Sequence, residues 1–274
     1  NGKELSYNNY NDIFASLEIL LSSGRDSSTV IVKHANPCGV SINKSSLSSF
    51  KNAFASDPLS AFGGVIACNF KISKIIANEI NKNFSEVILA KGFEKDALHV
   101  LKKKKNLRII DITKYKPKNK TTLRSFNNSF LIQDKDKLIF NKKNLRFVTK
   151  IKPTKKELKE IKFACNVSKF VKSNAIVLTN NFSTIGIGAG QSSRLDSCRI
   201  AVQKAKFFQK SKIKNSIASS DAFFPFPDGI KSLITAGVKI IVQPGGSIKD
   251  QEVIDVANKA KIKMIFTGIR HFNH

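Results

Sequence analysis

The chain has 274 residues, of which 41% are hydrophobic and 24% charged, and its formal net charge is +27. A chain of this length and composition buries a sizeable core, which excludes a peptide hormone, a disulfide mini-scaffold and an intrinsically disordered protein. The longest apolar stretch, residues 61–68, is far shorter than the roughly 20 residues of a bilayer span. Residues 1–11 are polar and begin with Asn1, so we expect neither a secretion signal nor a natural start, and interpret the chain as part of a longer one.

The cysteines and the basic residues narrow the class of protein further. Cys38, Cys68, Cys165 and Cys198 form no C-x-x-C pair, which indicates a reducing, cytoplasmic setting. The positive charge raises the alternative of a nucleic-acid-binding protein. Only 7 of the 47 basic residues are Arg, however, whereas phosphate recognition favours the bidentate guanidinium. The lysines accompany abundant Asn and Ile. This composition is more typical of drift toward A-rich codons than of selection for a binding face.

Helical and strand-like periods alternate through the first half of the chain, which predicts an α/β domain with covered sheets. We expect a first helix over residues 12–22, with one apolar face made of Ile13, Leu17, Leu20 and Leu21. A buried strand follows over residues 28–33. The remaining elements are helices near 46–55, 73–83 and 94–103 and strands at 65–69, 86–90 and 107–112. Each strand–helix–strand step predicts a parallel pair with a right-handed crossover.

A basic stretch, residues 102–120, precedes the second half. Residues 123–134 and 138–148 are predicted to be extended segments, flanked by turn-prone residues. We place a domain boundary near residue 150, which makes residues 1–150 and 151–274 two similar α/β units. Pro153-Thr154 begins a predicted helix that continues to about residue 172. The later elements are strands at 175–179, 238–242 and 263–266 and helices near 193–207, 228–236 and 250–260.

The first candidate string is Lys33-His34-Ala35-Asn36-Pro37-Cys38-Gly39, where a buried strand is expected to enter a loop. Strand ends of open α/β sheets are where ligands gather. The adjacent ammonium of Lys33 disfavours an imidazolium at His34 and favours a neutral base near pH 7. The alternative is a histidine that only serves the structure. The string also faintly resembles a zinc-deaminase signature, but Asn36 and Ser41 stand where that site needs Glu and Cys, so no zinc is expected.

Four further strings lie at the ends of predicted elements. Residues 185–194 hold three glycines and end in Arg194, which favours either a tight turn or a loop that holds an anion. Residues 219–229 place three Phe between Asp221 and Asp228; these rings either fill a core or stack on a heterocycle whose amino group a carboxylate binds. Residues 243–247 follow a strand and precede a helix. Residues 270–274 end the chain as a basic, aromatic tail of a kind that is commonly frayed.

Taken together, the five strings resemble the C-terminal formyltransferase region of the AICAR transformylase/IMP cyclohydrolase family of bifunctional purine-biosynthesis enzymes. The resemblance runs from Gly2-Lys3-Glu4-Leu5-Ser6-Tyr7-Asn8-Asn9 to the last residue and includes Lys169-Phe170-Val171-Lys172-Ser173-Asn174-Ala175-Ile176. It implies transfer of a formyl group from 10-formyltetrahydrofolate to the 5-amino group of AICAR ribonucleotide. It also implies two zinc-free, cytidine-deaminase-like α/β/α subdomains and a homodimer whose active sites are shared across the interface, with no specific nucleic-acid or membrane partner.

The resemblance also implies a role for each matching residue. His34 matches the proton acceptor, Lys33 the residue that stabilises the transition state, and Asn174 a side chain that orients the reacting groups. Contacts to the nucleotide carry over to Gly63, Glu86, Arg194, Phe223 and Arg270. Contacts to the folate carry over to Asp228, Ser247 and Ile248.

The chain departs from the family in three places. The cyclohydrolase domain is absent, together with an R-Y-G-x-N-P-H-Q stretch that helps to bind the nucleotide, so we expect weakened AICAR binding by this chain alone. Pro227 and Asn273 stand where relatives carry Arg. A second hypothesis is a basic RNA-binding protein that borrowed the scaffold and no longer catalyses. The sequence leaves open whether a structural monovalent cation stiffens the loops.

Overall fold

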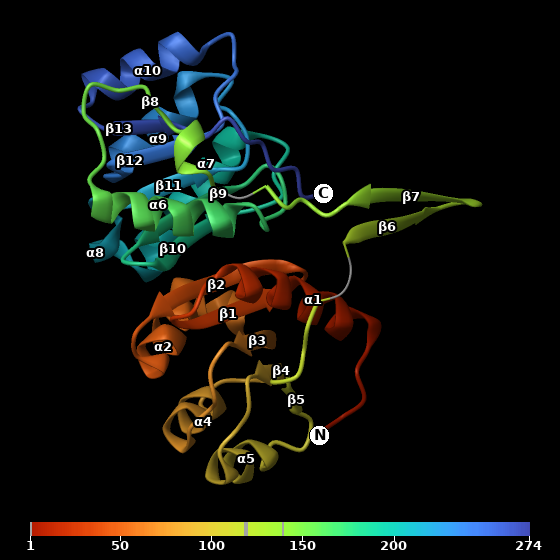
Figure 1. The fold of residues 1–274 in the computed structure, drawn as a ribbon. Helices are drawn as coiled ribbons and strands as arrows, with labels where there is room; N and C mark the ends of the chain where they lie inside the picture. Colours follow the sequence, from red (N-terminus) through yellow and green to blue (C-terminus); the bar gives the residue numbers. More distant parts are fainter. Residues whose placement is uncertain (1, 118–119, 139) are drawn as a thin grey trace.

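The computed structural model describes residues 2–117, 120–138 and 140–274 and shows an eleven-stranded mixed sheet covered by helices, with a separate two-stranded hairpin (Figure 1). The predicted α/β class is therefore confirmed. Lys118 and Asn119 of the basic stretch, Ile139 of a predicted extended segment, and Asn1 lie outside the described residues.

The first half of the chain begins with a helix that is capped by its own sequence. The Ser6 hydroxyl accepts the N–H of Asn9, and the Asn9 side chain accepts the N–H of Ser6, so two free amides at the helix start are satisfied. The elements of this half are α1 (Tyr7–Ser22), β1 (Ser27–Lys33), β2 (Asn36–Asn43), α2 (Ser46–Ser56), α3 (Pro58–Ala61), β3 (Gly64–Cys68), α4 (Lys74–Asn81), β4 (Ser85–Ala90), α5 (Lys95–Lys102) and β5 (Arg108–Asp111).

The second half also opens on a capped helix, because Thr154 and Glu157 form a capping box. A connecting region precedes it, with β6 (Thr121–Phe126), β7 (Ser129–Asp134), the short 3-10 helix η1 (Lys142–Asn144) and β8 (Arg146–Phe147). The elements that follow are α6 (Lys155–Ser168), β9 (Ile176–Asn180), β10 (Ser183–Gly188), α7 (Arg194–Phe208), α8 (Lys210–Ile213), β11 (Ile217–Ser220), α9 (Pro227–Ala236), β12 (Ile240–Gln243), α10 (Asp250–Lys259) and β13 (Lys263–Phe266).

The two halves repeat one topology and join edge to edge. The strand order is β5-β4-β3-β1-β2-β10-β9-β11-β12-β13-β8, so β2-β1-β3-β4-β5 in one half corresponds to β10-β9-β11-β12-β13 in the other. Each half starts with a helix and a tight hairpin, β1-β2 or β9-β10. The halves meet where Ser41 of β2 pairs with Ser183 of β10, whose hydroxyls lie 2.8 Å apart. β8, which precedes residue 150, pairs with β13.

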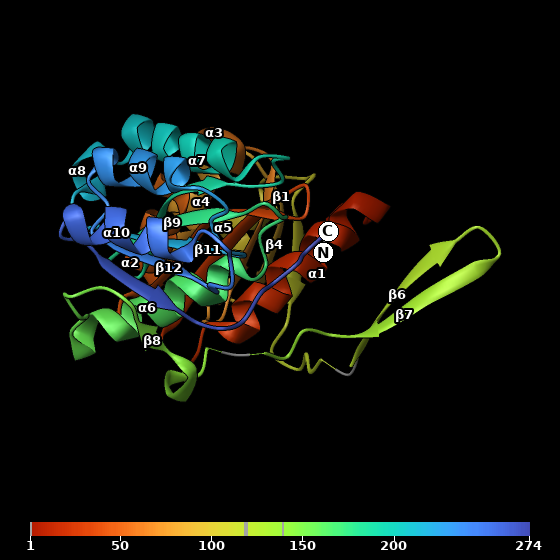
Figure 2. The same ribbon diagram turned by 90° about the horizontal axis from the view of Figure 1, so that it is seen from above.

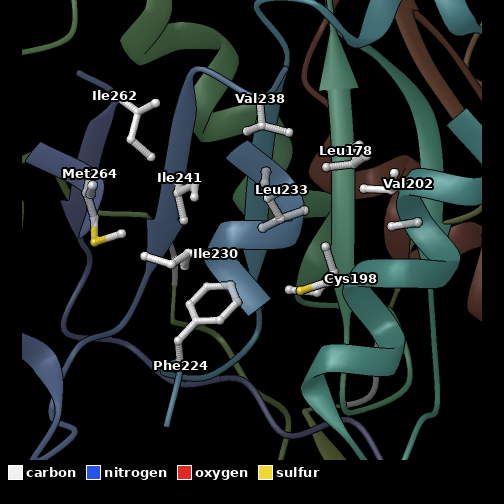
Figure 3. Packing of buried hydrophobic residues seen from close by; sticks show 14 of the residues in the cluster. Leu178, Cys198, Val202, Phe224, Ile230, Leu233, Val238, Ile241, Ile262 and Met264 are labelled. Atoms are coloured by element: carbon white, nitrogen blue, oxygen red, sulfur yellow. The ribbon is translucent and has the colours of Figure 1, made fainter. Parts of the chain in front are cut away.

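Helices cover both faces of the sheet, so the strands are buried on both sides. On one face, α1 packs on the first half and α6 on the second. On the other face, α2, α4 and α5 cover the first half, and α7, α9 and α10 cover the second. Figure 3 shows the latter core, in which the Phe224 ring lies near Ile230 and Cys198. Successive residues of one strand point to opposite faces of the sheet. Ile31 of β1 belongs to the core on one face and Val32 to the core on the other.

The hairpin β6-β7 projects away from both halves, as the two views in Figures 1 and 2 agree. All of its residues are exposed. Its register pairs Leu123 with Ile132 and Ser125 with Phe130 on one face, and Arg124 with Leu131 and Phe126 with Ser129 on the other. Both faces therefore carry exposed apolar side chains. An isolated two-stranded hairpin of this kind is at best marginally stable in water.

Several expectations from the sequence are wrong at the level of elements. Strands β2, β10 and β11 were not expected, and β1 pairs antiparallel with both of its neighbours instead of forming a parallel crossover pair with β3. The helix expected to reach residue 172 ends at Ser168. Among the described positions of 138–148, the only strand is the two-residue β8, and it is preceded by the 3-10 helix η1. Leu21, expected on the buried face of α1, is 49% exposed, whereas the buried apolar residues of this helix are Ile13, Leu17, Ile19 and Leu20.

Cys38, Cys68, Cys165 and Cys198 are all free and buried. None of the helices in the described part of the chain has both the length and the apolar character that a membrane crossing requires.

Candidate active site

Lys33 and His34 lie at the tip of the β1-β2 hairpin, not in a longer loop as the sequence suggested. Lys33 ends β1, and His34 and Ala35 form the turn with φ of 52° and 57°. Both values lie in the left-handed region, which disfavours residues with a Cβ. The carboxylate of Asp12 on α1 accepts the N–H of His34 at 3.3 Å and that of Ala35 at 2.6 Å, and so holds the turn. The arrangement leaves His34 exposed.

The Lys33 ammonium lies against the segment that contains Gly63. Its Nζ donates to the carbonyl oxygen of Phe62 at 2.5 Å. Gly63 has a φ of +71°, and a Cβ at this position would lie 3.1 Å from Lys33 Nζ and 3.3 Å from the Phe84 ring. Glycine is needed here for both reasons, since a side chain would be strained and would press on the ammonium. The structure thus brings Lys33, His34 and Gly63 to one edge of the first half.

Glu86 is engaged by neighbouring side chains. It lies on β4, accepts a hydrogen bond from Asn9 Nδ2 at 2.7 Å and lies 4.0 Å from a guanidinium nitrogen of Arg108. Asn9 and Asp12 are three residues apart on α1, so the same side of that helix holds Glu86 and the hairpin turn.

A second group of the expected residues surrounds a cavity in the other half. This cavity has a volume of about 430 Å³, within the usual range for small-molecule sites. Its walls come from the start of α7, the loop after β11, the start of α9 and the end of the chain. It is lined by Asn174, Arg194, Phe223, Asp228 and Arg270, and also by Ser192, Ser193, Phe226 and Phe272.

Arg194 is the buried centre of this group. Its guanidinium donates to Asn174 Oδ1 and Ser220 Oγ at 2.7 Å and to Asp221 Oδ1 at 2.5 Å, and the residue is only 8% exposed. Asn174 Nδ2 in turn donates to the carbonyl oxygen of Gln191 at 2.8 Å. A charge this deeply buried is tolerated because the Asp221 carboxylate pairs with it. Arg194 and Asn174 are therefore fixed in orientation before any ligand binds.

Asp221 does not serve as the free carboxylate that the Phe-rich string suggested. It also accepts the N–H groups of Ala175 and Ala222 and the hydroxyl of Ser173. With Arg194 included, its oxygens are already engaged. Asp221 thus holds the cavity wall together, a role that the sequence did not reveal.

The three Phe of that string have three different positions. Phe224 is 1% exposed and belongs to the core, whereas Phe226 is exposed on the cavity wall. Phe223 lies under the Arg270 guanidinium, whose central carbon is 4.7 Å from the ring centroid, a cation–π geometry. The two interpretations of the string, core filling and a flat ligand surface, each hold for part of it.

Of the three residues expected to contact the folate, Asp228 lines the cavity, whereas Ser247 and Ile248 are not among its lining residues. Asp228 is in the first turn of α9, where its Oδ1 accepts the N–H of Gly229 at 2.7 Å. Ser247 and Ile248 follow Gly246, at which a Cβ would lie 3.2 Å from an Arg270 nitrogen. The Ile248 side chain is fully exposed.

Two of the three glycines of residues 185–190 lie in a strand and not in an anion-binding loop. Gly186 and Gly188 belong to β10, and a Cβ on them would lie 2.1 Å from Ala201 O and 2.0 Å from Ser197 O of α7. They permit close packing of helix on strand. Gly39 of β2 has the same relation to Ala53 of α2, at 1.9 Å, which is the corresponding contact in the first half.

The thiols near these groups are not nucleophiles at neutral pH. Burial raises the pKa of Cys38, in the first string, to about 12, and likewise raises that of Cys198, beside the cavity, to about 12. Within residues 2–117, 120–138 and 140–274, no group of three or more His, Cys, Asp or Glu is placed to hold a metal ion.

The two groups are separate within one chain. Lys33, His34, Gly63 and Glu86 belong to the first half, and the lining of the cavity in the second half includes none of them. The hairpin tip approaches the second half where Asn36 Oδ1 accepts the N–H of Lys172 at 3.0 Å, and Ala35 lines another cavity together with Lys172 and Asn273.

These observations define a mixed α/β protein of two repeated halves, with a solvent-facing Lys-His turn in one half and a prearranged arginine cavity in the other. Residues 1–204 match the model of the AICARFT/IMPCHase bienzyme family, and the chain belongs to that family. It is 44% identical over 273 residues to the Bifunctional purine biosynthesis protein PurH of Thermoanaerobacter sp. (strain X514). It is 43% identical over 274 residues to the protein of the same name from Bacillus cytotoxicus. Each alignment covers 100% of this chain and 53% of the relative, so the chain spans about half the length of these relatives.

Proposed function

We propose that this chain transfers the formyl group of 10-formyltetrahydrofolate to the 5-amino group of AICAR ribonucleotide, as one activity of a cytoplasmic, bifunctional purine-biosynthesis enzyme. The observation that carries the proposal is the fixed Arg194–Asn174 pair in a cavity that Arg270 and Phe223 also line. Its cationic and aromatic character suits a nucleotide with an anionic phosphate and a planar base. The cyclohydrolase activity belongs to a part of the enzyme outside this chain.

The chemistry needs a base, because the acceptor amine is conjugated with an imidazole carboxamide and is a poor nucleophile. His34 takes the amine proton as the nitrogen attacks the formyl carbon. The bond between that carbon and N10 of the folate then breaks, and tetrahydrofolate leaves after N10 takes up a proton. Lys33 stabilises the negative charge that develops on the formyl oxygen, and Asn174 orients the reacting groups. The exposed position of His34 and the short Lys33 contact beside Gly63 support these roles.

Each of the remaining expected site residues contacts either the nucleotide substrate or the folate co-substrate. The nucleotide contacts Gly63, Glu86, Arg194, Phe223 and Arg270. The folate contacts Asp228, Ser247 and Ile248. A wall of Phe223, Phe226 and Phe272 next to the Asp228 carboxylate suits a flat heterocycle with amino groups, which supports folate binding at this opening.

The complete site is formed by two copies of the chain. In this homodimer, the Lys33–His34 turn of one copy faces the Arg194 cavity of its partner. The separation of the two groups within one chain supports this arrangement, and the exposed apolar hairpin β6-β7 supplies a surface that a second copy covers. The repeated halves support two zinc-free, cytidine-deaminase-like subdomains.

The decisive experiment measures tetrahydrofolate release from 10-formyltetrahydrofolate in the presence of AICAR ribonucleotide. We expect His34→Ala to reduce the rate at least about 100-fold, as loss of a general base does. His99→Ala, which removes a histidine of α5 outside both groups, is the matched control and keeps the parental rate. An unchanged rate for His34→Ala would remove His34 from the mechanism. No activity in the full-length protein, together with RNA affinity that survives physiological salt, would favour an RNA-binding protein instead.

A further inference from the structure

The C-terminal tail, residues 270–274, is held against the second half by hydrogen bonds at His271 and Asn273. His271 N–H donates to Asp221 O at 3.0 Å, and Asn273 O accepts the N–H of Ser173 at 3.0 Å. Asn273 Nδ2 also donates to the carbonyl oxygen of Phe170 at 2.8 Å. Arg270 precedes His271, and Phe272 lies between His271 and Asn273. Both Arg270 and Phe272 line the cavity. Because successive side chains of an extended segment point to opposite sides, holding His271 and Asn273 against the protein directs Arg270 and Phe272 toward the cavity.

The strongest anchor comes from a distant part of the sequence. His271 Nδ1 lies 2.6 Å from Asp136 Oδ2, and the two side chains are 12% and 38% exposed. Asp136 is two residues past the end of β7, at the root of the projecting hairpin. Lys169, just after α6, holds this segment through hydrogen bonds from its Nζ to the carbonyl oxygens of Asp136, at 2.5 Å, and Leu138, at 3.1 Å.

The Asp136 carboxylate is ionised at neutral pH. Burial opposes its charge, but hydrogen bonds from His271 and from the N–H of Leu138, together with the nearby charge of Lys169, lower the pKa of Asp136. The bond from His271 is therefore charge-assisted and stronger than a bond between neutral groups.

We propose that Asp136 is a positioning residue, which fixes Arg270 toward the cavity by holding the ring of His271. The inference rests on the proposed role of Arg270 in binding an anionic nucleotide. Without this anchor the tail occupies more conformations, and Arg270 faces the ligand in only a fraction of them. Apparent affinity for the nucleotide falls by that fraction, whereas the chemical step, which uses Lys33 and His34, is unaffected.

The test replaces Asp136 by Asn and compares it with Asp134→Asn, which makes the same change at the neighbouring end of β7. We expect Asp136→Asn to speed deuterium exchange of the His271 backbone amide, which donates to Asp221 O, about tenfold, the effect of weakening one charge-assisted hydrogen bond. The dissociation constant for AICAR ribonucleotide, measured by calorimetry, rises by a similar factor, and kcat changes by less than about threefold. Asp134→Asn changes none of these values.

A pair of substitutions at His271 separates the anchor from a loss of packing. His271→Gln retains a side-chain N–H donor and restores most of the nucleotide affinity, whereas His271→Leu reproduces the defect of Asp136→Asn. Equal affinity in the Gln and Leu variants, or unchanged exchange in Asp136→Asn, would overturn the inference.

Arg270→Met distinguishes failure of this inference from failure of the proposed function. If Arg270→Met leaves the nucleotide affinity unchanged, the proposed binding role of the cavity is wrong. If Arg270→Met weakens binding and Asp136→Asn does not, the cavity binds the nucleotide and the positioning role of Asp136 alone is wrong.

Discussion

The turn that follows Lys33 has a strained backbone at His34 and Ala35, and hydrogen bonds hold it in place. His34 and Ala35 both have positive φ, and each such residue costs on the order of 1 kcal/mol. The Asp12 carboxylate offsets part of this cost through its two hydrogen bonds to the turn. The same two-residue turn in the second half, Asn181-Phe182, also has positive φ but carries no basic residue. Strain is thus common to both hairpins, and the basic side chains are specific to the first.

Lys33 provides the test of transition-state stabilisation at the residue scale. We expect Lys33→Met to lower kcat at least about 100-fold with little change in KM, because the ammonium acts on charge that forms only in the transition state. Lys71→Met, which removes another lysine of the same half, leaves both constants unchanged. An increase in KM alone would make Lys33 a binding residue.

Single residues also show where sequence reasoning reaches its limit. The motif around Arg194 correctly marked a residue at a helix start, but its buried pairing with Asp221 depends on two segments meeting in space. A carboxylate next to an aromatic string looks the same in the sequence whether it is free or fully engaged. The tail, expected to be frayed, is fastened because Asp136 and Lys172, remote in the sequence, reach it.

At the scale of elements, the longer helices and most of the parallel strands were predictable because their apolar periods are regular, although the parallel strand β11 was missed. Strands β2 and β10 were missed because Pro37, Gly39, Gly186 and Gly188 are poor strand residues. Their glycines are required by tertiary packing, since α2 and α7 lie directly on these strands. This contact forms only when strand and helix are brought together, so no local pattern records it.

The junction of the two halves is stabilised by a partly buried ion pair that responds to pH. Lys204 Nζ of α7 lies 2.7 Å from Asp57 Oδ2, which caps α3, and the Asp57 side chain is 5% exposed. Burial disfavours the charged carboxylate, but hydrogen bonds from Lys204 and Ser60 outweigh it and lower the pKa of Asp57 below its usual 3.8. The folded state therefore gains stability from this group above about pH 4 and loses it as the pH falls through the lowered pKa.

We expect Asp57→Asn to reduce the free energy of unfolding by about 1.5 kcal/mol at pH 7, because the mutation leaves Lys204 without its charged partner. The difference from the parent should shrink as the pH falls from about 4 through the lowered pKa, because the unfolded state takes up a proton first and the folded state only at lower pH. Urea unfolding at several pH values measures it. Asp196→Asn, at an exposed pair with Arg199, should cost less than about 0.5 kcal/mol. A constant difference down to pH 3 would contradict the assignment.

At the scale of the whole molecule, the exposed apolar hairpin β6-β7 and the two separate groups of site residues support the proposed homodimer. The hairpin β6-β7 exposes more than 60% of each of Leu123, Phe126, Phe130, Leu131 and Ile132 on its two faces. A twofold-symmetric dimer covers such a surface twice, once for each copy. It also allows the Lys33–His34 turn and the Arg194 cavity to form two identical sites.

Mixing two inactive variants tests whether each site is shared between copies. His34→Ala and Asn174→Ala proteins, each nearly inactive, are unfolded together, refolded and assayed for tetrahydrofolate release. In a shared-site dimer, half of the refolded molecules are hybrids, and each hybrid has one site with an intact His34 from one copy and an intact Asn174 from the other. About a quarter of the parental activity should therefore return. Ile132→Asp in both variants places a charge on the hairpin and should abolish the recovery, whereas Thr122→Asp, already an exposed polar position, should not. If both groups formed a site within one chain, every copy would carry one defect, and mixing would restore nothing.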